Sequence, residues 1–400
     1  MENPKIRFKG FTKDWEQRKL GDVFKEYSEK NHTELSALTI IQGGGTVKRE
    51  DSDRNLMYDT SNLSNYKMVR KDDFIVHLRS FEGGLEKSSL DGIISPAYHT
   101  FHSDMADSRF YYPYFRSYEF IKHKLVSHVY GIRDGRSIDI DGMKTIEIPY
   151  TSIEEQRKIG DYLDCLDHLI TLHQRKCEQT KNLKKYMLQK MFPQNGAKVP
   201  EIRFNGFTHD WEQRKFGDVV QVRRGLTYKP SDVQETGVRV LRSSNINEDT
   251  FVCGNDDVFV NPKTVNIDTV KQNDILITSA NGSSRLVGKH ALIKGIPDES
   301  AVHGGFMLLG ITKNYDFINA SMNSSWYIRF INIYVTGGNG AIGNLSKSDL
   351  DEQLILVPSD LEQKKIGEYF TNLDHLITLH QRQCDELKKM KKYMLQNMFI

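Results

Sequence analysis

Long apolar runs are missing from this sequence of 400 residues, and their absence excludes several classes of protein. No window approaches the roughly 18 consecutive apolar residues that a membrane-spanning helix needs. The N-terminal stretch MENPKIRFKG also lacks the apolar core of a signal peptide. Hydrophobic residues form 38% of the chain and charged residues 27%, as is typical of a globular protein. We therefore expect a cytoplasmic protein that makes no contact with a membrane.

Cysteine is scarce, with four residues in the chain. No two of them form a C-x-x-C pair, and none combines with histidine at the spacing of a zinc site. Cys177 and Cys384 occupy equivalent points of a repeated helical segment, so we expect both to pack as small apolar side chains. The sequence predicts no metal site.

Signatures of catalysis are also missing. The chain has no PP dipeptide, which the pocket of an amino-methyltransferase requires, and no G-x-S-x-G or H-E-x-x-H motif. GSSRLVGKH (Gly282–His290) has one residue too many for a P-loop and lacks its final Ser or Thr. Gly338, Gly340 and Gly343 satisfy G-x-G-x-x-G, but polar NLSKSD follows where an apolar helix should begin. The sequence therefore predicts a non-catalytic chain that holds no cofactor.

Neither sign of charge dominates. There are 55 lysines and arginines against 53 aspartates and glutamates, for a net charge of +2. A chain with so little net charge does not coat nucleic acid along its whole surface. Any contact with nucleic acid must therefore come from local clusters.

What the chain does contain is a second copy of parts of itself. PKIRFKGFTKDWEQRKLGDV (Pro4–Val23) returns as PEIRFNGFTHDWEQRKFGDV (Pro200–Val219), with 16 of 20 positions identical. Glu154–Pro193 returns as Leu361–Ile400, with 26 of 40 positions identical. Such self-similarity outranks other sequence signals and indicates one scaffold used twice.

The second repeated segment predicts a long helix. It contains no proline before its end. Apolar or seam-like residues recur along it, and the early steps alternate four and three, which is the spacing of a coiled coil. One helix of this length cannot bury its stripe alone, so we expect the two copies to pair antiparallel about a pseudo-twofold axis. The predicted seam consists of Ile159, Leu163, Leu166, Ile170, His173, Cys177, Thr180, Met187 and Met191, with Ile366, Phe370, Leu373, Ile377, His380, Cys384, Leu387, Met394 and Met398 in the second copy.

Polar residues in these helices are repeated without change, which favours a second docked surface. The block LDHLITLHQR is identical in both copies. A recent duplication would also explain the identity, and the segment would then be only a helical spacer or a dimerisation hairpin. The candidate partner-binding residues are Asp167, His168, Gln174, Arg175, Asp374, His375, Gln381 and Arg382.

Between the repeated frames lie two stretches with almost no resemblance to each other, the first insert (Phe24–Ile153) and the second insert (Val220–Asp360). Both predict a mixed α/β domain: strands, then a helix near Phe110–Val129 or Asn319–Ile333, then a strand and a proline. We therefore expect the inserts to share a fold while presenting different side chains.

Arginine, asparagine, serine and tyrosine gather in the predicted loops of both inserts. Arginine pairs with guanine edges, asparagine with adenine, and lysine or serine with phosphates, so these clusters suit a base-reading surface. For any single residue, a plain solvated surface position is at least as good an interpretation, so the clusters carry the prediction better than their members do. The candidates are Lys48, Arg49, Arg54, Arg79, Ser80, Tyr98, Arg133 and Arg136 in the first insert, and Arg223, Arg224, Tyr228, Arg242, Ser243, Asn245, Ser279, Asn281, Ser283 and Arg285 in the second.

The order of the frames resembles a known family. WEQRKLG at Trp15–Gly21, a strand ending in Ile-Pro, EEQRKIG at Glu154–Gly160 and a lysine-rich helix make one set. WEQRKFG at Trp211–Gly217, Val-Pro and LEQKKIG at Leu361–Gly367 make the second. This arrangement is similar to the specificity subunit of type I restriction–modification systems, over essentially the whole chain.

The resemblance implies an α+β fold with two globular α/β target recognition domains separated by two long antiparallel coiled-coil helices. Carried onto this chain, it predicts a first recognition domain over residues 1–153 and a long helix over 154–193. A linker and the second recognition domain follow over 194–360, then the second long helix over 361–400. The inserts would recognise the two halves of a bipartite DNA site, and the helices would set the unread spacer.

The implied partners are double-stranded DNA, two methyltransferase subunits docked on the helices, and two motor nuclease subunits. S-adenosylmethionine, ATP and Mg²⁺ would belong to those partner subunits. The alternative is a stand-alone tandem-domain DNA-binding regulator. A regulator bound to a palindrome would repeat its readers, whereas these inserts differ, which favours an asymmetric target. The sequence gives neither the bases recognised nor the spacer length.

Overall fold

The computed structural model describes residues 3–52, 60–77, 84–130, 137–335 and 343–399. Contacts between residues divide the chain into two units. Unit 1 consists of Met1–Gln174 with Gln381–Ile400, and unit 2 is Arg175–His380. Each unit therefore holds one insert together with part of each long helix. Among the described residues, no helix is long and apolar enough to cross a membrane.

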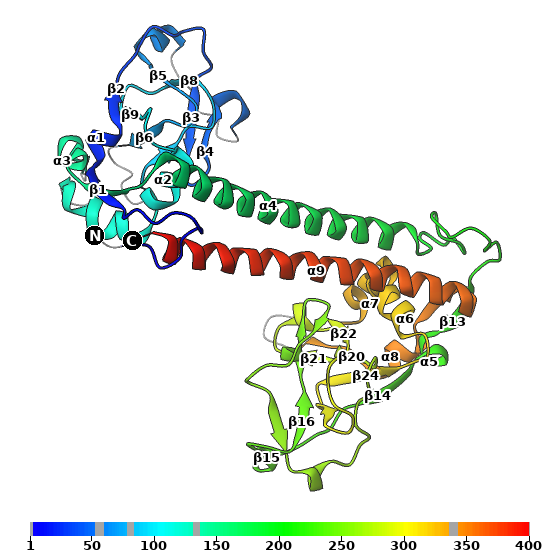
Figure 1. The fold of residues 1–400 in the computed structure, drawn as a ribbon. Coiled ribbons are helices and arrows are strands. Elements are labelled where there is room, and N and C mark those ends of the chain that lie inside the picture. Colours follow the sequence, from blue (N-terminus) through cyan, green and yellow to red (C-terminus); the bar gives the residue numbers. More distant parts are fainter. Residues whose placement is uncertain (1–2, 53–59, 78–83, 131–136, 336–342, 400) are drawn as a thin grey trace. The chain divides into compact units, whose positions relative to one another are not determined.

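Both predicted long helices are present and unbroken, α4 (Ile153–Lys190) and α9 (Asp360–Met398) (Figure 1). The heptad pattern correctly identified the buried side: Ile159, Leu163 and Cys177 are buried in α4. Cys384 is buried in α9, as expected from its equivalent position. The buried seam residues lie on one side of each helix because they recur at the coiled-coil spacing.

The two helices pair in opposite directions, as the repeat predicted. In unit 1, Ile159 near the start of α4 shares a core with Met398 at the end of α9. In unit 2, Met191 just beyond the end of α4 shares a core with Ile366 and Phe370 near the start of α9. The start of one helix thus meets the end of the other in each unit, which is an antiparallel arrangement.

The first insert is built on a four-stranded sheet with the order β2-β9-β6-β7. Smaller pairs flank it, β3 with β4, β5 with β8, and β10 with β11. Its elements are β2 (Lys25–Tyr27), β3 (Leu38–Ile41), β4 (Gly45–Lys48), β5 (Lys67–Val69), β6 (Phe74–His77), β7 (Glu86–Lys87), β8 (Gly92–Ile94), β9 (Tyr98–His102), α2 (Ser108–Phe115), β10 (Val129–Tyr130), β11 (Ser137–Ile138) and α3 (Ile140–Lys144).

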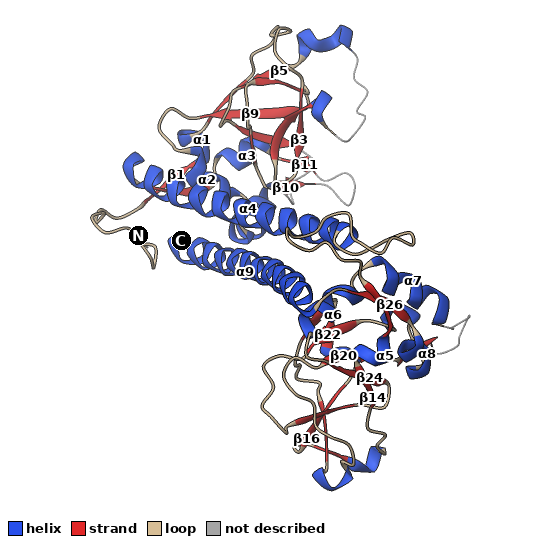
Figure 2. Cartoon of the chain, turned by 90° about the vertical axis from the view of Figure 1, so that its right-hand side faces the viewer, coloured by secondary structure: helices blue, strands red, loops and turns tan. Residues whose placement is uncertain are grey.

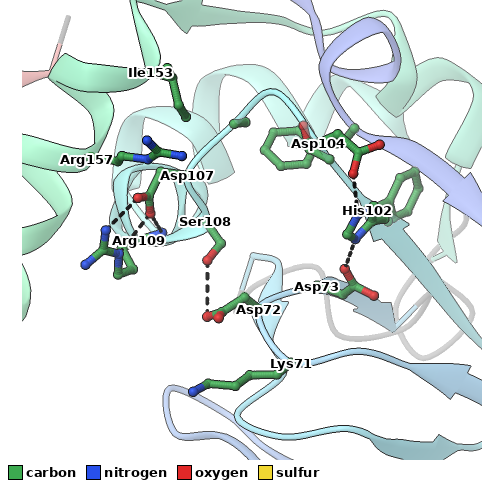
Figure 3. A pocket seen from close by; sticks show the side chains of 14 residues that line it. Lys71, Asp72, Asp73, His102, Asp104, Asp107, Ser108, Arg109, Ile153 and Arg157 are labelled. Atoms are coloured by element: carbon green, nitrogen blue, oxygen red, sulfur yellow. Dashed lines mark hydrogen bonds and ion pairs between the residues drawn. The ribbon is translucent and has the colours of Figure 1, made fainter.

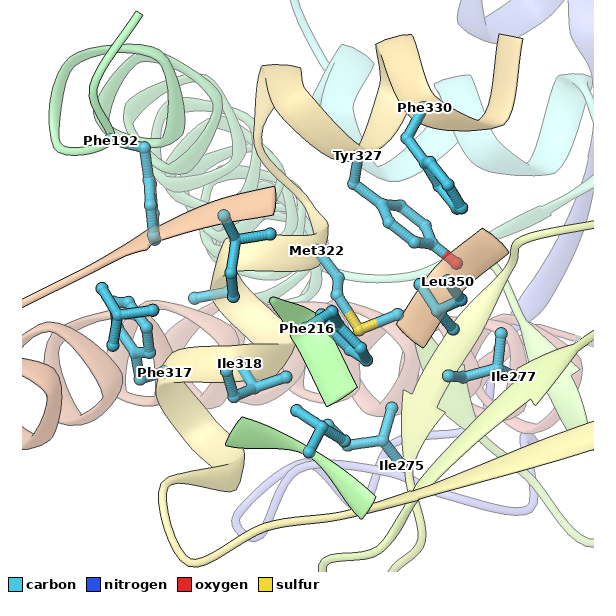
Figure 4. Close-up of a cluster of buried hydrophobic side chains, with 14 of the residues drawn as sticks. Phe192, Phe216, Ile275, Ile277, Phe317, Ile318, Met322, Tyr327, Phe330 and Leu350 are labelled. Atoms are coloured by element: carbon cyan, nitrogen blue, oxygen red, sulfur yellow. The ribbon is translucent and has the colours of Figure 1, made fainter. Parts of the chain in front are cut away.

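The second insert has two four-stranded sheets, β14-β24-β20-β22 and β15-β19-β16-β23 (Figure 2). Helices α6 and α7 contribute Phe317, Tyr327 and Phe330 to the core beside the first of these sheets (Figure 4). Its elements are β14 (Gln221–Arg224), β15 (Val233–Gln234), β16 (Val238–Leu241), β17 (Ile246–Asn247), β18 (Thr250–Phe251), β19 (Val258–Val260), β20 (Ile275–Thr278), β21 (Ala280–Asn281), β22 (His290–Leu292), β23 (Ala301–His303), β24 (Met307–Ile311), α6 (Tyr315–Met322), α7 (Ser325–Tyr334), β25 (Gly343–Asn344) and α8 (Lys347–Glu352).

The two inserts share one topology despite their unlike sequences. The order β2-β9-β6-β7 corresponds strand for strand to β14-β24-β20-β22, and every pair in both sheets is antiparallel. The turn before the third strand is also the same, with Asp72 and Asn273 in the left-handed region at φ 72° and 70°. Aspartate and asparagine tolerate that conformation better than most residues. The predicted common fold is therefore confirmed at the level of strand register.

Both expected helices are divided in the structure. The helix expected near Phe110–Val129 is α2, which ends at Phe115, followed by the short helical turns Phe120–Lys124 and Leu125–His128. The helix expected near Asn319–Ile333 is α6 followed by α7, with a break at Asn323 and Ser324. Residues 91–102 form two strands, β8 and β9, because the chain turns at Ser95–Ala97 and Pro96 has no N–H for a ladder. Tight turns between apolar runs are the features that periodicity alone does not locate.

The repeated segment before each insert, Pro4–Val23 or Pro200–Val219, contacts a long helix through a buried carboxylate. We call this segment the N-terminal frame. In unit 1, Glu155 Oε1 accepts a hydrogen bond from Arg7 Nε at 2.6 Å, and Glu155 Oε2 accepts one from Trp15 Nε1 at 3.1 Å. In unit 2, Arg203 Nε donates to Glu362 Oε1 at 2.7 Å. Both glutamates are buried. A buried carboxylate needs such partners, so the frame is a structural device rather than a recognition site.

Short strands complete this frame. β1 (Glu16–Lys19) pairs with β12 (Glu147–Tyr150) in unit 1, and β13 (Glu212–Lys215) pairs with β26 (Leu354–Val357) in unit 2. The short helices α1 (Leu20–Val23) and α5 (Phe216–Val219) follow β1 and β13. The strand before each insert thus pairs with the strand at its end, so the two ends of the insert lie side by side.

Candidate nucleic-acid interface

Four strand ends of the second insert meet at one turn, residues 304–306. Arg224, the last residue of β14, pairs with Leu308, and Thr278, the last residue of β20, pairs with Met307. Leu241 at the end of β16 pairs with the last residue of β23. The segments that follow these strands therefore lie together, and we call them the loop edge: residues 225–229, 242–245, 279–285 and 304–306.

Hydrogen bonds connect the segments of the loop edge. Asn281 Nδ2 donates to Ser243 Oγ at 2.9 Å, which joins two clusters that the sequence analysis kept apart. The backbone N–H groups of Ser279 and Ala280 both donate to the carbonyl of Phe306, at 2.9 and 3.1 Å. The loops form one connected surface.

The arginines of this region differ in how firmly they are held. Arg223 pairs with Asp268 beside β14. Arg242 Nη2 donates to the carbonyl of Asp256 at 2.8 Å, which orients its side chain. Arg224 and Arg285 are exposed. Exposed and oriented guanidinium groups at one edge give the local positive charge that phosphate or guanine recognition requires.

Two of the candidate residues are buried. Asn245 is 1% exposed, and its amide donates to the carbonyl of Val252 at 3.0 Å and to Asp257 Oδ1 at 2.7 Å. Ser279 is also buried. These contacts hold the loops in shape and leave Asn245 facing the protein, so the geometry does not favour a base contact there. Tyr228 is half-buried against the small cluster around Val240.

His303 lies directly before the shared turn and is buried. Burial lowers its pKa to about 4, although nearby backbone hydrogen bonds act in the opposite direction. The imidazole is therefore neutral near pH 7, and the positive charge of the loop edge comes from arginine and lysine.

In the first insert, three aromatic and basic residues lie together. The Arg49 guanidinium is 5.5 Å from the centre of the Tyr66 ring. Burial raises the pKa of Tyr98, and the charge of nearby Arg49 partly opposes that rise. Lys48 is partly buried, and its Nζ lies 3.7 Å from Glu50 Oε1. Arg54, Arg79, Ser80, Arg133 and Arg136 lie outside the described residues, as do Gly338 and Gly340 of the G-x-G-x-x-G loop.

An open hollow of about 480 Å³ in unit 1 lies where the first insert meets the first turns of α4 (Figure 3). His102 lies between Asp73 and Asp104, with its Nδ1 2.5 Å from Asp73 Oδ1. Burial lowers the pKa of His102, but the two carboxylates outweigh that effect and raise it above its usual value. Arg109 pairs with Asp107 in the same wall. These charges satisfy one another, so the hollow resembles an internal ion-pair network more than a ligand site.

Two of the predicted partner-binding residues form ion pairs between the long helices. Asp167 Oδ1 lies 2.5 Å from Lys391 Nζ in unit 1. Asp374 Oδ1 lies 2.5 Å from Lys184 Nζ in unit 2, and Lys184 also reaches Asp249 of the second insert at 2.8 Å. Burial lowers the pKa of Lys184, but the two carboxylates outweigh it, so the net pKa is raised.

The other predicted helix residues lie on the outer surface. Arg382 Nε donates to Glu386 one turn further along α9, at 2.9 Å. The remaining ones, His168, Gln174, Arg175, His375 and Gln381, are exposed. They stand off the seam, as the sequence analysis expected of them.

An apolar set on the surface of both helices was not predicted from the sequence, and we call it the exposed stripe: Leu183, Tyr186, Met390 and Tyr393. These side chains are 44, 48, 47 and 57% exposed. Leu183 and Met390 are equivalent positions of the repeat, as are the two tyrosines. In the sequence, these residues form a second apolar pattern, one position before the heptad positions of the seam. Lysines lie on both sides of them, so the pattern is not apparent from hydrophobicity alone. Exposed apolar residues repeated at matching points indicate a contact surface.

Among the described residues, no group of three or more His, Cys, Asp or Glu side chains is placed to hold a metal ion. Gly343 belongs to the short strand β25, which pairs with β21 beside the loop edge. That residue therefore does not open a helix, and the described part of its loop lacks the strand-turn-helix context of a dinucleotide site.

Comparison with known proteins gives consistent results. The family model described as the type I restriction modification DNA specificity domain matches twice, over residues 12–182 and 208–389. The type I restriction enzyme MjaVIII specificity subunit of Methanocaldococcus jannaschii is 24% identical over 272 residues, which are 64% of this chain and 61% of that protein. The putative MjaX specificity subunit of the same organism is 25% identical over 265 residues, 64% of this chain and 59% of that protein. The chain thus spans about three fifths of the length of these curated relatives.

The fold is also similar to that of a solved structure over the whole chain. That structure is the S subunit of a type I restriction–modification system from M. genitalium, with a TM-score of 0.61 and 17% sequence identity. The match covers 100% of this chain and 99% of that one. At this identity the likeness establishes the fold alone.

Proposed function

This chain belongs to the family of the type I restriction modification DNA specificity domain, which it contains twice, and on that premise we propose how it works. It is the DNA-recognition subunit of a type I restriction–modification complex. Each insert recognises one half of a bipartite, asymmetric site in double-stranded DNA, and the chain itself catalyses no reaction.

The observation that carries this proposal is the contrast between shared topology and different loops. The inserts have the same sheet order, yet the clusters differ, with Arg49 and Tyr98 in one and Arg242, Ser243 and Asn281 in the other. A stand-alone regulator bound to a palindrome would need equal readers. Two inserts with the same fold but different loop residues are suited to a DNA target whose two half-sites differ in sequence.

We propose that the exposed stripe and the outer polar residues of α4 and α9 dock two methyltransferase subunits. The support is their repetition: Tyr186 and Tyr393 occupy equivalent positions, as do His168 and His375, so one partner can bind twice. Motor nuclease subunits would join this assembly in the cytoplasm. S-adenosylmethionine, ATP and Mg²⁺ would be bound by the partner subunits.

A domain exchange tests the proposal. The full chain is co-expressed with its methyltransferase partner, and residues 24–153 are replaced by the corresponding insert of a relative. We expect the methylated motif of the host genome to change in one half only, because each insert contacts its own half-site. The matched control replaces residues 220–360 and should change the other half. A change in both halves after either exchange contradicts independent recognition, and failure to recover a methyltransferase with the chain contradicts the assembly.

A further inference from the structure

A large apolar side chain stands at the centre of the loop edge without an assigned role. Phe306 is 69% exposed, which is unusual for phenylalanine, a residue that proteins mostly bury. It ends the turn on which the strands β14, β16, β20 and β23 converge. An exposed ring in the middle of a polar, arginine-bearing surface calls for a contact that covers it.

The backbone of this turn is fixed from several sides. Met307 N donates to Gly304 O at 2.8 Å, and Gly304 N donates to Leu241 O at 2.9 Å. The Phe306 carbonyl accepts the two hydrogen bonds from the β20 loop described above. The ring therefore projects from a rigid base, so that little conformational entropy would be lost when it makes a contact.

Glycine makes this tight arrangement possible. A Cβ atom at Gly225 would lie 2.0 Å from the carbonyl oxygen of Gly304. The loop after β14 thus approaches the turn closely enough that only glycine fits. The exposure of Phe306 is consequently a feature of a closely packed turn and not of a loose loop.

The equivalent turn of the first insert carries no such ring. By strand register, Tyr98 of β9 corresponds to Met307 of β24, so Ala97 corresponds to Phe306. Ala97 is also exposed. The common framework therefore presents a small side chain at this point in one insert and an aromatic one in the other.

We propose that Phe306 is a specificity-determining residue that packs its ring against the bases of the half-site recognised by the second insert. This inference rests on the proposed function. Arg224, Arg242 and Arg285 hold the phosphates and polar base edges around it, and the ring covers apolar base surface at the centre. Apolar side chains that wedge against a base step partly unstack it, which favours sequences that deform readily.

The test uses the full chain with the methyltransferase subunit that co-purifies with it, and a randomised DNA duplex library. The wild-type complex selects a consensus, and its affinity for that duplex is measured by fluorescence anisotropy. We expect Phe306→Ala to raise Kd roughly tenfold, in the range of base–aromatic contacts, and to relax the consensus in one half-site only. Phe306→Tyr keeps the ring and should retain most of the affinity.

The matched control is Ile333→Ala, since Ile333 is 70% exposed in the same insert but lies on α7. Its Kd and consensus should stay within about twofold of wild type. An unchanged Kd and consensus for Phe306→Ala contradict the inference while the proposed function stands. A wild-type complex that selects no sequence contradicts the proposed function and this inference with it.

Discussion

At the scale of single residues, the repeated motifs are explained by buried polar chemistry. Glu155 and Glu362 begin the long helices with carboxylates that water cannot reach, and Arg7 and Arg203 neutralise them. Removing one partner of a buried ion pair leaves the other charge without compensation. The frames are thus retained for folding, whereas the loops between them are free to differ.

We predict that Glu155→Gln lowers the free energy of unfolding of the first half of the chain by about 3 kcal/mol, because the partly buried Arg7 guanidinium loses its counter-charge. Chemical denaturation followed by tryptophan fluorescence measures the change, since Trp15 also contacts this carboxylate. Glu154→Gln is the control, because Glu154 is the exposed neighbour. Equal midpoints for the two variants would refute the structural role of the frame.

Residue roles were only partly predictable from the sequence. The packing of Cys177 and Cys384 followed from heptad spacing, which depends on local geometry alone. The burial of Asn245 did not, because it depends on Asp257 folding back onto the same loop. Phe306 was equally hidden, since its exposure is set by four strands that are distant in sequence.

At the scale of elements, each long helix has two distinct sides. The seam holds the partner helix, with Lys184–Asp374 and Lys391–Asp167 as matching ion pairs at its margin. The exposed stripe faces outward at Tyr186. The seam was predictable from periodicity, but the second stripe is interrupted by lysines and glutamines, so the pattern alone did not separate it from a solvated face.

We predict that Tyr186→Ala reduces the number of bound methyltransferase subunits from two to one, and that the double variant with Tyr393→Ala loses both. Each tyrosine presents apolar area at one of two equivalent docking positions. Mass photometry of the purified complex counts the subunits. The control is the pair Lys181→Ala and Lys388→Ala, exposed equivalents on the same helices. Full occupancy in the double tyrosine variant would show that docking occurs elsewhere.

In the inserts, the order of the elements was predictable from the sequence, but the ends of individual strands were not. Their common order of strands and helix was expected from the sequence, yet the break between β8 and β9 was not. β8 is apolar, β9 mixes aromatic and polar residues, and Pro96 lies between them. Pairing partners of strands two to five residues long are decided by tertiary contacts, which carry no local signature.

At the scale of the whole molecule, α4 starts in unit 1 and ends in unit 2, and α9 does the reverse. We predict that inserting seven residues after Gln174 and after Gln381 lengthens the unread spacer of the DNA target by roughly three base pairs. Seven residues preserve the heptad seam and add about 10 Å of helix.

Methylome sequencing of cells that carry this variant and its methyltransferase measures the spacer directly. Insertion into α4 alone is the control. It leaves the two helices unequal in length and offsets their pairing by one heptad, so it should abolish methylation instead of widening the spacer. An unchanged spacer in the double insertion would mean that the helices do not set it.

The exchange of helix ends has a consequence for how the protein is made. Met394, Met398 and Phe399 complete the apolar core of unit 1, while Met191 and Phe192 complete that of unit 2. The ribosome therefore releases the first insert long before the side chains that finish its core have been synthesised. Until then its aromatic socket around Phe110 and Tyr114 stays open. If translation stops before α9, the first half keeps apolar surface exposed and is prone to aggregate. Such a truncated chain becomes a substrate for the chaperones and proteases that act on exposed apolar surface.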